Sequence, residues 1–305
     1  MILAAVLAAA ASIAPPFAPP VDVPLHYRLV EFGDNPRGPV RVANHQTLRF
    51  TRSGDGFEAV LVANAHEVEA PEPYRTLLAL PLTPFEGVAT RLRLDHAGAP
   101  QGILDGERTW TALRSAGDAL LAGIEASAAI GPDEKQGART MIARTFDLAP
   151  AGVNALLTDT VTMMLPPPLP TLAVGETRGF TATLRSPVGA LPSGGTVTLV
   201  AADDAHLSYR VETRSDPAAT DRAVAELSAS LQGASTPEAR ARVATSVAGI
   251  RGTAYVERIE LVLDRRTGLI TSSRTERTAI LADGSSRPLG HGEIVREDRS
   301  DHQGI

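Results

Sequence analysis

Hydrophobic and polar residues alternate in several stretches of the chain, which is the pattern of a β-strand with one buried face. The clearest stretches are residues 40–52, 88–95 and 206–213. In the last of these, Leu207, Tyr209 and Val211 alternate with polar neighbours. Short Asp-Gly and Gly-containing sequences separate neighbouring stretches, so we expect successive strands to form hairpins.

Apolar residues recur every three or four positions elsewhere, which predicts amphipathic helices. The first is expected at about 106–130, where Gly131-Pro132 ends it and starts a second, because proline is favoured in a first helical turn. A third should end at the proline run 166–170. A fourth is expected after Ser215-Asp216-Pro217, and a short one after Ser235-Thr236-Pro237-Glu238, which has the spacing of a capping box.

Strands joined by hairpins indicate antiparallel sheet, and helices grouped in blocks indicate an α+β fold instead of an alternating α/β fold. About ten strands would curl, so we expect one or two strongly curved antiparallel sheets that cradle the amphipathic helices. Residues 92–98 (LRLDHAG) resemble residues 261–268 (LVLDRRTG) when one gap is allowed. This similarity is the pattern of a fold built from two repeated halves.

The start of the chain suggests export. Residues 2–14 are apolar and uncharged, too short for a membrane-spanning helix of about 20 residues but the length of a signal-peptide core. No Lys or Arg precedes Arg28, so the usual positive start of a signal peptide is missing. We expect a periplasmic or secreted protein, with no transmembrane helix in the mature chain. The expected parts are a signal peptide at 1–14, a Pro-rich tether at 15–24, a first half of strands then helices at 25–165, a second half of strands, helices and strands at 171–298, and a polar tail at 299–305.

Composition excludes several kinds of chemistry. The 305 residues include no cysteine, which excludes disulfides, thiol nucleophiles and Cys-based metal sites. The only lysine, Lys135, lies in the sequence GPDEKQG, which is not the setting of a Schiff-base, Ser-Lys or phosphate-loop lysine. The chain carries 29 basic and 35 acidic residues, a net charge of −6, without a long basic run. We expect no nucleic-acid partner and no cofactor.

Catalytic and metal-binding motifs are also missing. Residues 54–59 (GDGFEA) have the spacing of a dinucleotide fingerprint, but that motif needs a strand before it and a helix after it, and here a strand follows. His66 is next to Glu67, yet neighbouring residues of a strand point to opposite faces. Other His–acid pairs, such as His291 and Glu293, have no third ligand nearby in the sequence. We predict no catalytic residue and no metal site.

Four aromatic residues are candidates for lining a ligand cavity. Phe180, Tyr209 and Tyr255 occupy inward positions of expected strands, and Trp110 lies on the apolar stripe of the first helix. Packing in an ordinary core would account for the same positions. Their role depends on whether the sheet and the helices close tightly or leave a pocket.

The proline run at 165–170 (LPPPLP) and residues 174–177 (VGET) precede strands, a helix and a hairpin at 263–270. This arrangement resembles exported bacterial cell-envelope proteins of uncharacterised function. A curved sheet around helices is also similar to the half-barrels of periplasmic lipoprotein carriers. The resemblance covers roughly residues 25–298 in outline and rests on short structural motifs, so it implies a location and a fold and transfers no catalytic residue.

Two functions of different classes follow. The first is a non-enzymatic envelope protein whose curved sheet binds an apolar ligand, such as a lipid, or a lipidated partner, and a scaffold role that engages an envelope protein fits the same observations. The alternative is a hydrolase that uses Asp, Glu, His or Ser residues dispersed in the sequence, with His45, His66 and His206 as its motivation. The missing catalytic motifs favour the first.

Overall fold

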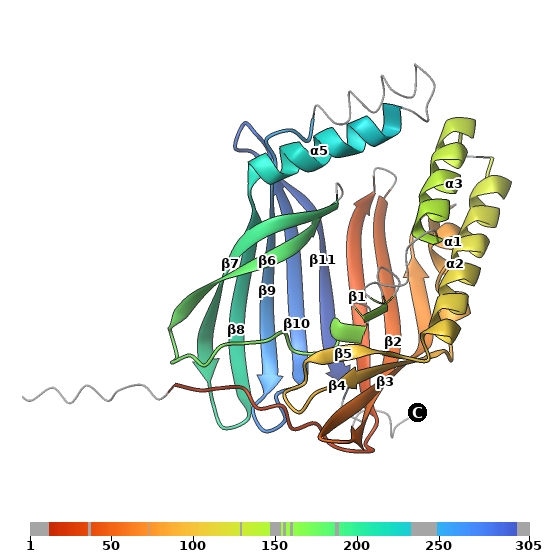
Figure 1. The fold of residues 1–305 in the computed structure, drawn as a ribbon. Helices are drawn as coiled ribbons and strands as arrows, with labels where there is room; N and C mark the ends of the chain where they lie inside the picture. Colours follow the sequence, from red (N-terminus) through yellow and green to blue (C-terminus); the bar gives the residue numbers. More distant parts are fainter. Residues whose placement is uncertain are drawn as a thin grey trace, which may run out of the picture.

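One large curved antiparallel sheet dominates the computed structural model (Figure 1). Its eleven strands run in the order β5-β4-β3-β2-β1-β11-β10-β9-β8-β7-β6, and the edge strands β5 and β6 do not pair, so the sheet is unclosed. The expected antiparallel α+β fold is confirmed. The residues that the structure describes are 12–35, 38–72, 74–128, 130–146, 154, 157–158, 161–186, 189–232 and 249–297.

Most elements follow the sequence patterns. The strands are β1 (Leu25–Asn35), β2 (Gly38–Ser53), β3 (Gly56–Glu69), β4 (Ala89–Leu94), β5 (Pro100–Leu104), β6 (Thr177–Ser186), β7 (Gly189–Ala202), β8 (His206–Ser215), β9 (Ala254–Asp264), β10 (Ile270–Ile280) and β11 (Ser286–Glu297). The helices are α1 (Tyr74–Ala79), the short 3₁₀ helix η1 (Thr83–Phe85), α2 (Gly106–Ala126), α3 (Pro132–Phe146) and α5 (Pro217–Gln232).

The helices expected near 106 and after 131 and 217 are present as α2, α3 and α5. Of the third expected helix, only a few described residues are helical, among them Leu157 and Val161. The short helix that the capping sequence at 235–238 predicts lies outside the described residues. β5 and α1 have no sequence pattern that predicts them. Both are six residues long or shorter, which is too short for a periodic pattern to be read.

β1 and β11, the first and last strands of the chain, pair with each other in the middle of the sheet. We call this pairing the seam. β1 pairs with β2 on one edge and with β11 on the other, so Leu29 lies opposite both Asn44 and Ile294. The strands β5 to β1 lie on one side of the seam and β11 to β6 on the other, so the two sides have five and six strands. The expected duplication of two halves is not confirmed. The seam makes residues from both ends of the chain part of one continuous surface.

Alternation gives the sheet two different faces. On β4, Leu92 and Leu94 are buried while Arg93 is exposed, as the sequence predicted. On β8, Leu207 and Tyr209 are buried in the same way. The apolar residues of successive strands are paired in register, so they form one concave face on which the helices lie. Exposed charged side chains such as Arg93 on β4 and Arg210 on β8 lie on the convex face.

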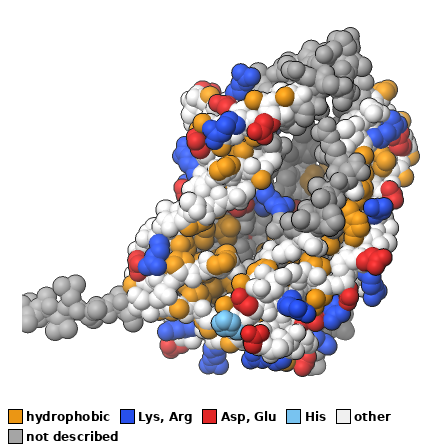
Figure 2. Space-filling view, in the orientation of Figure 1, with side chains coloured by type: hydrophobic (Ala, Val, Ile, Leu, Met, Phe, Trp, Pro, Cys, Tyr) orange, Lys and Arg blue, Asp and Glu red, His pale blue; other side chains and the backbone are white. Residues whose placement is uncertain are grey.

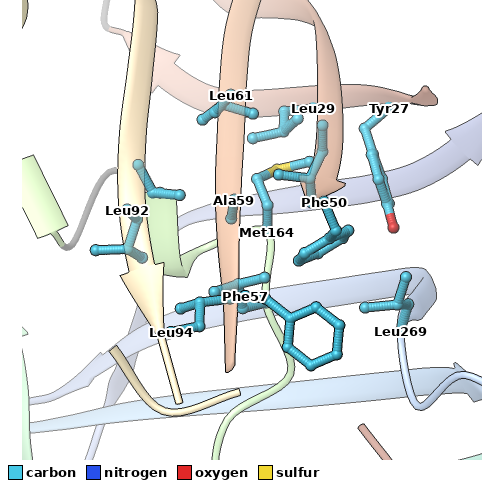
Figure 3. Packing of buried hydrophobic residues seen from close by; sticks show 13 residues of the cluster. Tyr27, Leu29, Phe50, Phe57, Ala59, Leu61, Leu92, Leu94, Met164 and Leu269 are labelled. Atoms are coloured by element: carbon cyan, nitrogen blue, oxygen red, sulfur yellow. The ribbon is translucent and has the colours of Figure 1, made fainter. Parts of the chain in front are cut away.

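The first-half core fills the concave side of β1 to β4 (Figure 3). Met164 and Leu269, which come from outside these strands, pack into it. The cluster comprises Tyr27, Leu29, Leu48, Phe50, Phe57, Ala59, Leu61, Leu92, Leu94, Val161, Met164, Leu165 and Leu269. Because Leu269 precedes β10, this core also connects the two sides of the sheet.

Residues 12–24, here called the N-terminal segment, run in contact with the ends of several strands (Figure 1). The ring of Phe17 packs edge-on against Phe50 and Phe57, with centroids 5.9 and 5.5 Å away. The Ala18 N–H donates to the Thr267 carbonyl at 2.9 Å. These contacts hold the N-terminal segment against the body of the protein.

Turn chemistry accounts for the similarity between residues 92–98 and 261–268. Asp95 accepts hydrogen bonds from two backbone N–H groups of the β4–β5 turn, and Asp264 does the same in the β9–β10 turn. Each turn ends in a glycine with positive φ, 85° at Gly98 and 72° at Gly268. Asp and Gly favour such turns for local reasons, so the shared sequence does not need a duplication.

Candidate functional site

The second half of the sheet carries the candidate site, an apolar surface on the concave side of β7 to β10. Period-two alternation places its residues on this face, and the register brings Tyr209 opposite Leu199 on one side and Leu261 on the other. We call this group the β7–β10 cluster. It comprises Leu172, Val197, Leu199, Leu207, Tyr209, Val211, Leu261, Leu263 and Ile270.

A thin cover lies over part of this cluster. Leu172 is fully buried in it, and Ile13 and Leu169 pack against it while partly exposed. The Ile13 and Leu172 backbones exchange two hydrogen bonds, of 2.8 and 3.1 Å, in an isolated bridge. The cover therefore consists of non-strand segments with few backbone hydrogen bonds, which favours local opening.

Partly exposed apolar residues extend the cluster to its rim. They are Phe180 on β6, Ala202 on β7, Ile259 on β9 and Ile294 on β11. In Figure 2, hydrophobic side chains gather just below the diagonal band that β6 and β7 form in Figure 1. The apolar surface thus continues from a buried cluster to a solvent-accessible rim, as in a site that receives an apolar group.

Phe180 is positioned by a neighbouring glycine. An ideal Cβ at Gly195 would lie 2.5 Å from Cζ of Phe180, so the ring occupies the space above that residue. Gly195 is directly opposite Phe180 in the β6–β7 register. A larger residue at 195 would push the ring away from the sheet, so this glycine keeps Phe180 at the rim of the cluster.

The four aromatic candidates do not form one group. Tyr209 lies within the β7–β10 cluster and Phe180 packs against it. Tyr255 lies in a separate small cluster with Leu184, and Ala223 of α5 packs against that cluster. Trp110 on α2 contacts Phe146 of α3 edge-on, with centroids 5.6 Å apart. Whether any of them touches a ligand remains a prediction.

Burial affects both candidate tyrosines. Desolvation raises the pKa of the Tyr209 and Tyr255 hydroxyls above the ordinary tyrosine value, so both stay protonated. The Tyr209 hydroxyl is buried without a hydrogen-bond partner among the described residues. By contrast, the Tyr27 hydroxyl donates to the Ile270 carbonyl at 3.1 Å.

The cover formed by Ile13, Leu169 and Leu172 is not among the sequence-predicted site residues. Ile13 falls in the stretch expected to be a signal peptide, and Leu169 and Leu172 lie in or next to the proline run between the two expected halves. The available signal was that each is a large apolar residue within an otherwise extended, proline-rich segment. Such residues in a free linker would expose apolar area, so their presence indicates a packed segment.

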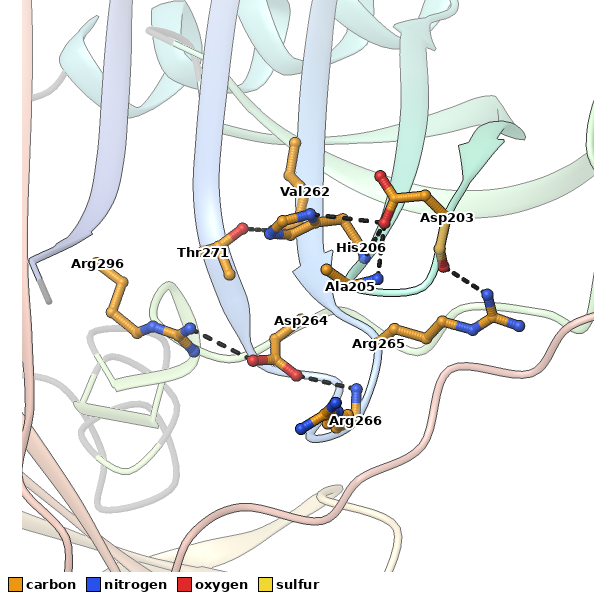
Figure 4. A network of polar contacts seen from close by, with 9 residues as sticks. All are labelled: Asp203, Ala205, His206, Val262, Asp264, Arg265, Arg266, Thr271 and Arg296. Atoms are coloured by element: carbon orange, nitrogen blue, oxygen red, sulfur yellow. Dashed lines mark hydrogen bonds and ion pairs between the residues drawn. The ribbon is translucent and has the colours of Figure 1, made fainter.

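Polar contacts at the lower ends of β8 to β10 form a network (Figure 4). Asp264 accepts the N–H groups of Arg266 and Thr267 and lies 3.4 Å from Arg296 Nη2. Asp203 accepts the N–H groups of Ala205 and His206, each at 2.7 Å. These bonds close turns, and they lower the pKa of the Asp203 carboxyl, with the Ala205 bond the larger cause.

The three histidines that motivated the hydrolase alternative do not meet. His45 is on the convex face of β2, 3.8 Å from Glu67, and His66 is on the other face of β3, 2.6 Å from Glu86. His206 begins β8, on the far side of the seam. They therefore do not form a common site.

The described residues offer few other candidate sites. No group of three His, Asp or Glu residues in this part of the chain is placed to hold a metal ion. A pocket of about 340 Å³ is lined by Phe32, Arg274, Glu276 and His291, whose side chains share the convex face in register. None of the helices in the described ranges has the length and apolar character that a membrane crossing requires.

Comparisons with known proteins supply no family. No family model matches the chain, and no curated protein matches it significantly.

Proposed function

We propose that this protein binds acyl chains on the concave face of its sheet, as a non-enzymatic protein of the cell envelope. The observation that carries the proposal is the continuity between the buried β7–β10 cluster and its partly exposed rim at Phe180, Ile259 and Ile294. The apolar start of the sequence supports export.

An acyl chain suits this surface because the interaction needs no directional groups. Each methylene that leaves water contributes about 0.8 kcal/mol, so a few buried methylenes give measurable affinity. The same chain chemistry is present in a free lipid and in the lipid anchor of a protein. The surface could bind the chain of a free lipid or the chain of a lipid anchor, and the experiments below distinguish the two.

Uptake of a fluorescent fatty acid and a fluorescent phospholipid by the delipidated protein tests the proposal. We expect saturable binding, weakened about tenfold or more in Phe180→Asp, which places a charge at the apolar rim. Thr181→Asp is the matched control, because Thr181 is the next residue and is exposed on the opposite face of β6. A wild-type protein that takes up neither probe would refute acyl binding.

Native mass spectrometry of the protein from a periplasmic fraction separates the two sources of the chain. A co-purifying mass of lipid size indicates a free lipid, and a larger mass that loses an acylated polypeptide indicates a lipidated partner. A bare chain that also fails the uptake assay would favour the scaffold role instead.

A further inference from the structure

We propose that Tyr209 donates a hydrogen bond to the carbonyl oxygen of an acyl ester or amide, and so selects carbonyl-bearing chains over bare hydrocarbon or ether-linked chains. This inference rests on the acyl binding proposed above. It adds the class of ligand that the site prefers and the residue that recognises it.

Tyr209 is buried among apolar side chains. It lies in the middle of β8, with Leu199 and Leu261 opposite it on the neighbouring strands and Leu207 and Val211 two positions away along its own strand. These four neighbours offer only apolar side chains. Tyr209 is 2% exposed, so its hydroxyl is removed from bulk water as well.

The buried hydroxyl of Tyr209 lacks a hydrogen-bond acceptor within the described part of the chain. The Tyr209 hydroxyl has no hydrogen-bond partner among the described residues, whereas the equally buried Tyr27 hydroxyl bonds to the Ile270 carbonyl. A buried hydroxyl without a partner loses its hydrogen bonds to water and gains nothing in return. Phenylalanine would fill nearly the same volume at a lower cost, so a donor at this position is best explained by an acceptor that arrives with a ligand.

A ligand would reach the Tyr209 hydroxyl by entering at the rim and displacing the cover. Leu172, Leu169 and Ile13 lie over the cluster, held by the two-bond bridge between Ile13 and Leu172. Phe180 and Ile259 border the cluster and are partly exposed. A chain that enters at this rim and displaces the thin cover would lie against β8, beside Tyr209.

The chemistry of the cluster selects the type of acceptor. The four residues that surround Tyr209 on β7, β8 and β9 are all apolar, so a charged headgroup placed beside it would be buried without a partner at a large cost. An ester or amide carbonyl is a neutral acceptor attached directly to a hydrocarbon chain. Its methylenes bury against the leucines while its oxygen receives the hydroxyl proton.

Competition between two matched lipids tests this inference. The probes are a diester and a diether phosphatidylcholine with identical 16-carbon chains, each displacing the fluorescent fatty acid from the full-length protein. We expect the diester to bind about three- to tenfold more tightly, the effect of one neutral hydrogen bond. Tyr209→Phe should bind both lipids equally, because it keeps the ring and loses only the donor.

Tyr27→Phe is the matched control. It removes a hydroxyl that is bonded within the protein and lies in the first-half core, so the preference for the diester should persist. Without lipid, Tyr209→Phe should unfold at the same or a higher urea concentration than the wild type, and Tyr27→Phe at a lower one.

The outcomes separate the two proposals. A wild-type protein that binds both lipids equally overturns the role of Tyr209 and leaves acyl binding standing, and so does a Tyr209→Phe variant that keeps the full preference. A protein that binds neither lipid overturns both proposals. If the Tyr209→Phe variant does not fold, the wild-type comparison still tests the preference for carbonyl-bearing chains, and equal binding of both lipids overturns the inference.

Discussion

The ring of Phe17 occupies the space that a side chain on Gly98 would need: an ideal Cβ at Gly98 would lie 2.6 Å from Cδ2 of Phe17. A second glycine, Gly268, meets the same segment, because its ideal Cβ would overlap the carbonyl oxygen of Pro16. The β4–β5 turn and the β9–β10 turn, which lie on the two sides of the seam, thus both need glycine where they contact the N-terminal segment.

Replacing Gly98 by alanine should therefore destabilise the protein more than its backbone conformation alone requires. Gly284 is the matched control, because its φ of 82° is close to the 85° of Gly98 and nothing lies within 4 Å of its ideal Cβ. We expect Gly284→Ala to lower the free energy of unfolding by about 1–2 kcal/mol, the cost of left-handed backbone. Gly98→Ala should cost about 1–3 kcal/mol more through overpacking. Equal losses in urea unfolding would contradict the packing of Phe17.

The two faces of β4 should respond differently to truncation. Leu92 is fully buried and Arg93, the next residue, is exposed. We expect Leu92→Ala to lower the free energy of unfolding by about 2–5 kcal/mol, and Arg93→Ala to change it by about 0.5 kcal/mol or less. Similar effects of both changes in chemical denaturation would disprove this assignment of the faces.

Tyr209 offers a stability test of the second half. Truncating it to alanine removes a buried ring from the β7–β10 cluster, so the free energy of unfolding should fall by about 3–5 kcal/mol. Arg210→Ala, on the exposed face of the same strand, is the control. A loss below about 1 kcal/mol for Tyr209→Ala would be incompatible with its buried position.

Acid should weaken the β9–β10 turn through Asp264. Burial by itself would raise the pKa of this carboxyl, but hydrogen bonds from the Thr267 and Arg266 N–H groups and from Arg296 outweigh it, so the pKa is lowered. A carboxyl with a lowered pKa stabilises the fold above its unfolded value of about 3.9, and the contribution is lost as pH falls through the lower folded value.

Asp264→Asn should therefore be less stable than the wild type at pH 7, and its stability should fall less steeply below about pH 4. Urea unfolding of both proteins between pH 7 and the acid limit measures the difference. Parallel pH profiles would show that Asp264 does not contribute in this way.

Local sequence patterns determined the strand faces, the helix starts and the antiparallel α+β architecture of this protein. The alternation around Leu92 and Tyr209 predicted which side chains are buried, because a strand places neighbouring residues on opposite faces whatever it pairs with. The proline at 132 and the capping sequence at 215–217 predicted where helices begin, because these effects act within one turn. Antiparallel α+β architecture followed from these elements.

The tertiary structure alone decided the rest. The β1–β11 seam joins strands from the two ends of the chain, and no local pattern specifies such a pairing. The cover formed by Ile13 and Leu172, and the missing partner of the Tyr209 hydroxyl, depend on segments that are distant in sequence and meet only in the folded chain. Periodicity determines which face of an element is apolar, whereas the burial of that face against particular distant partners determines the site.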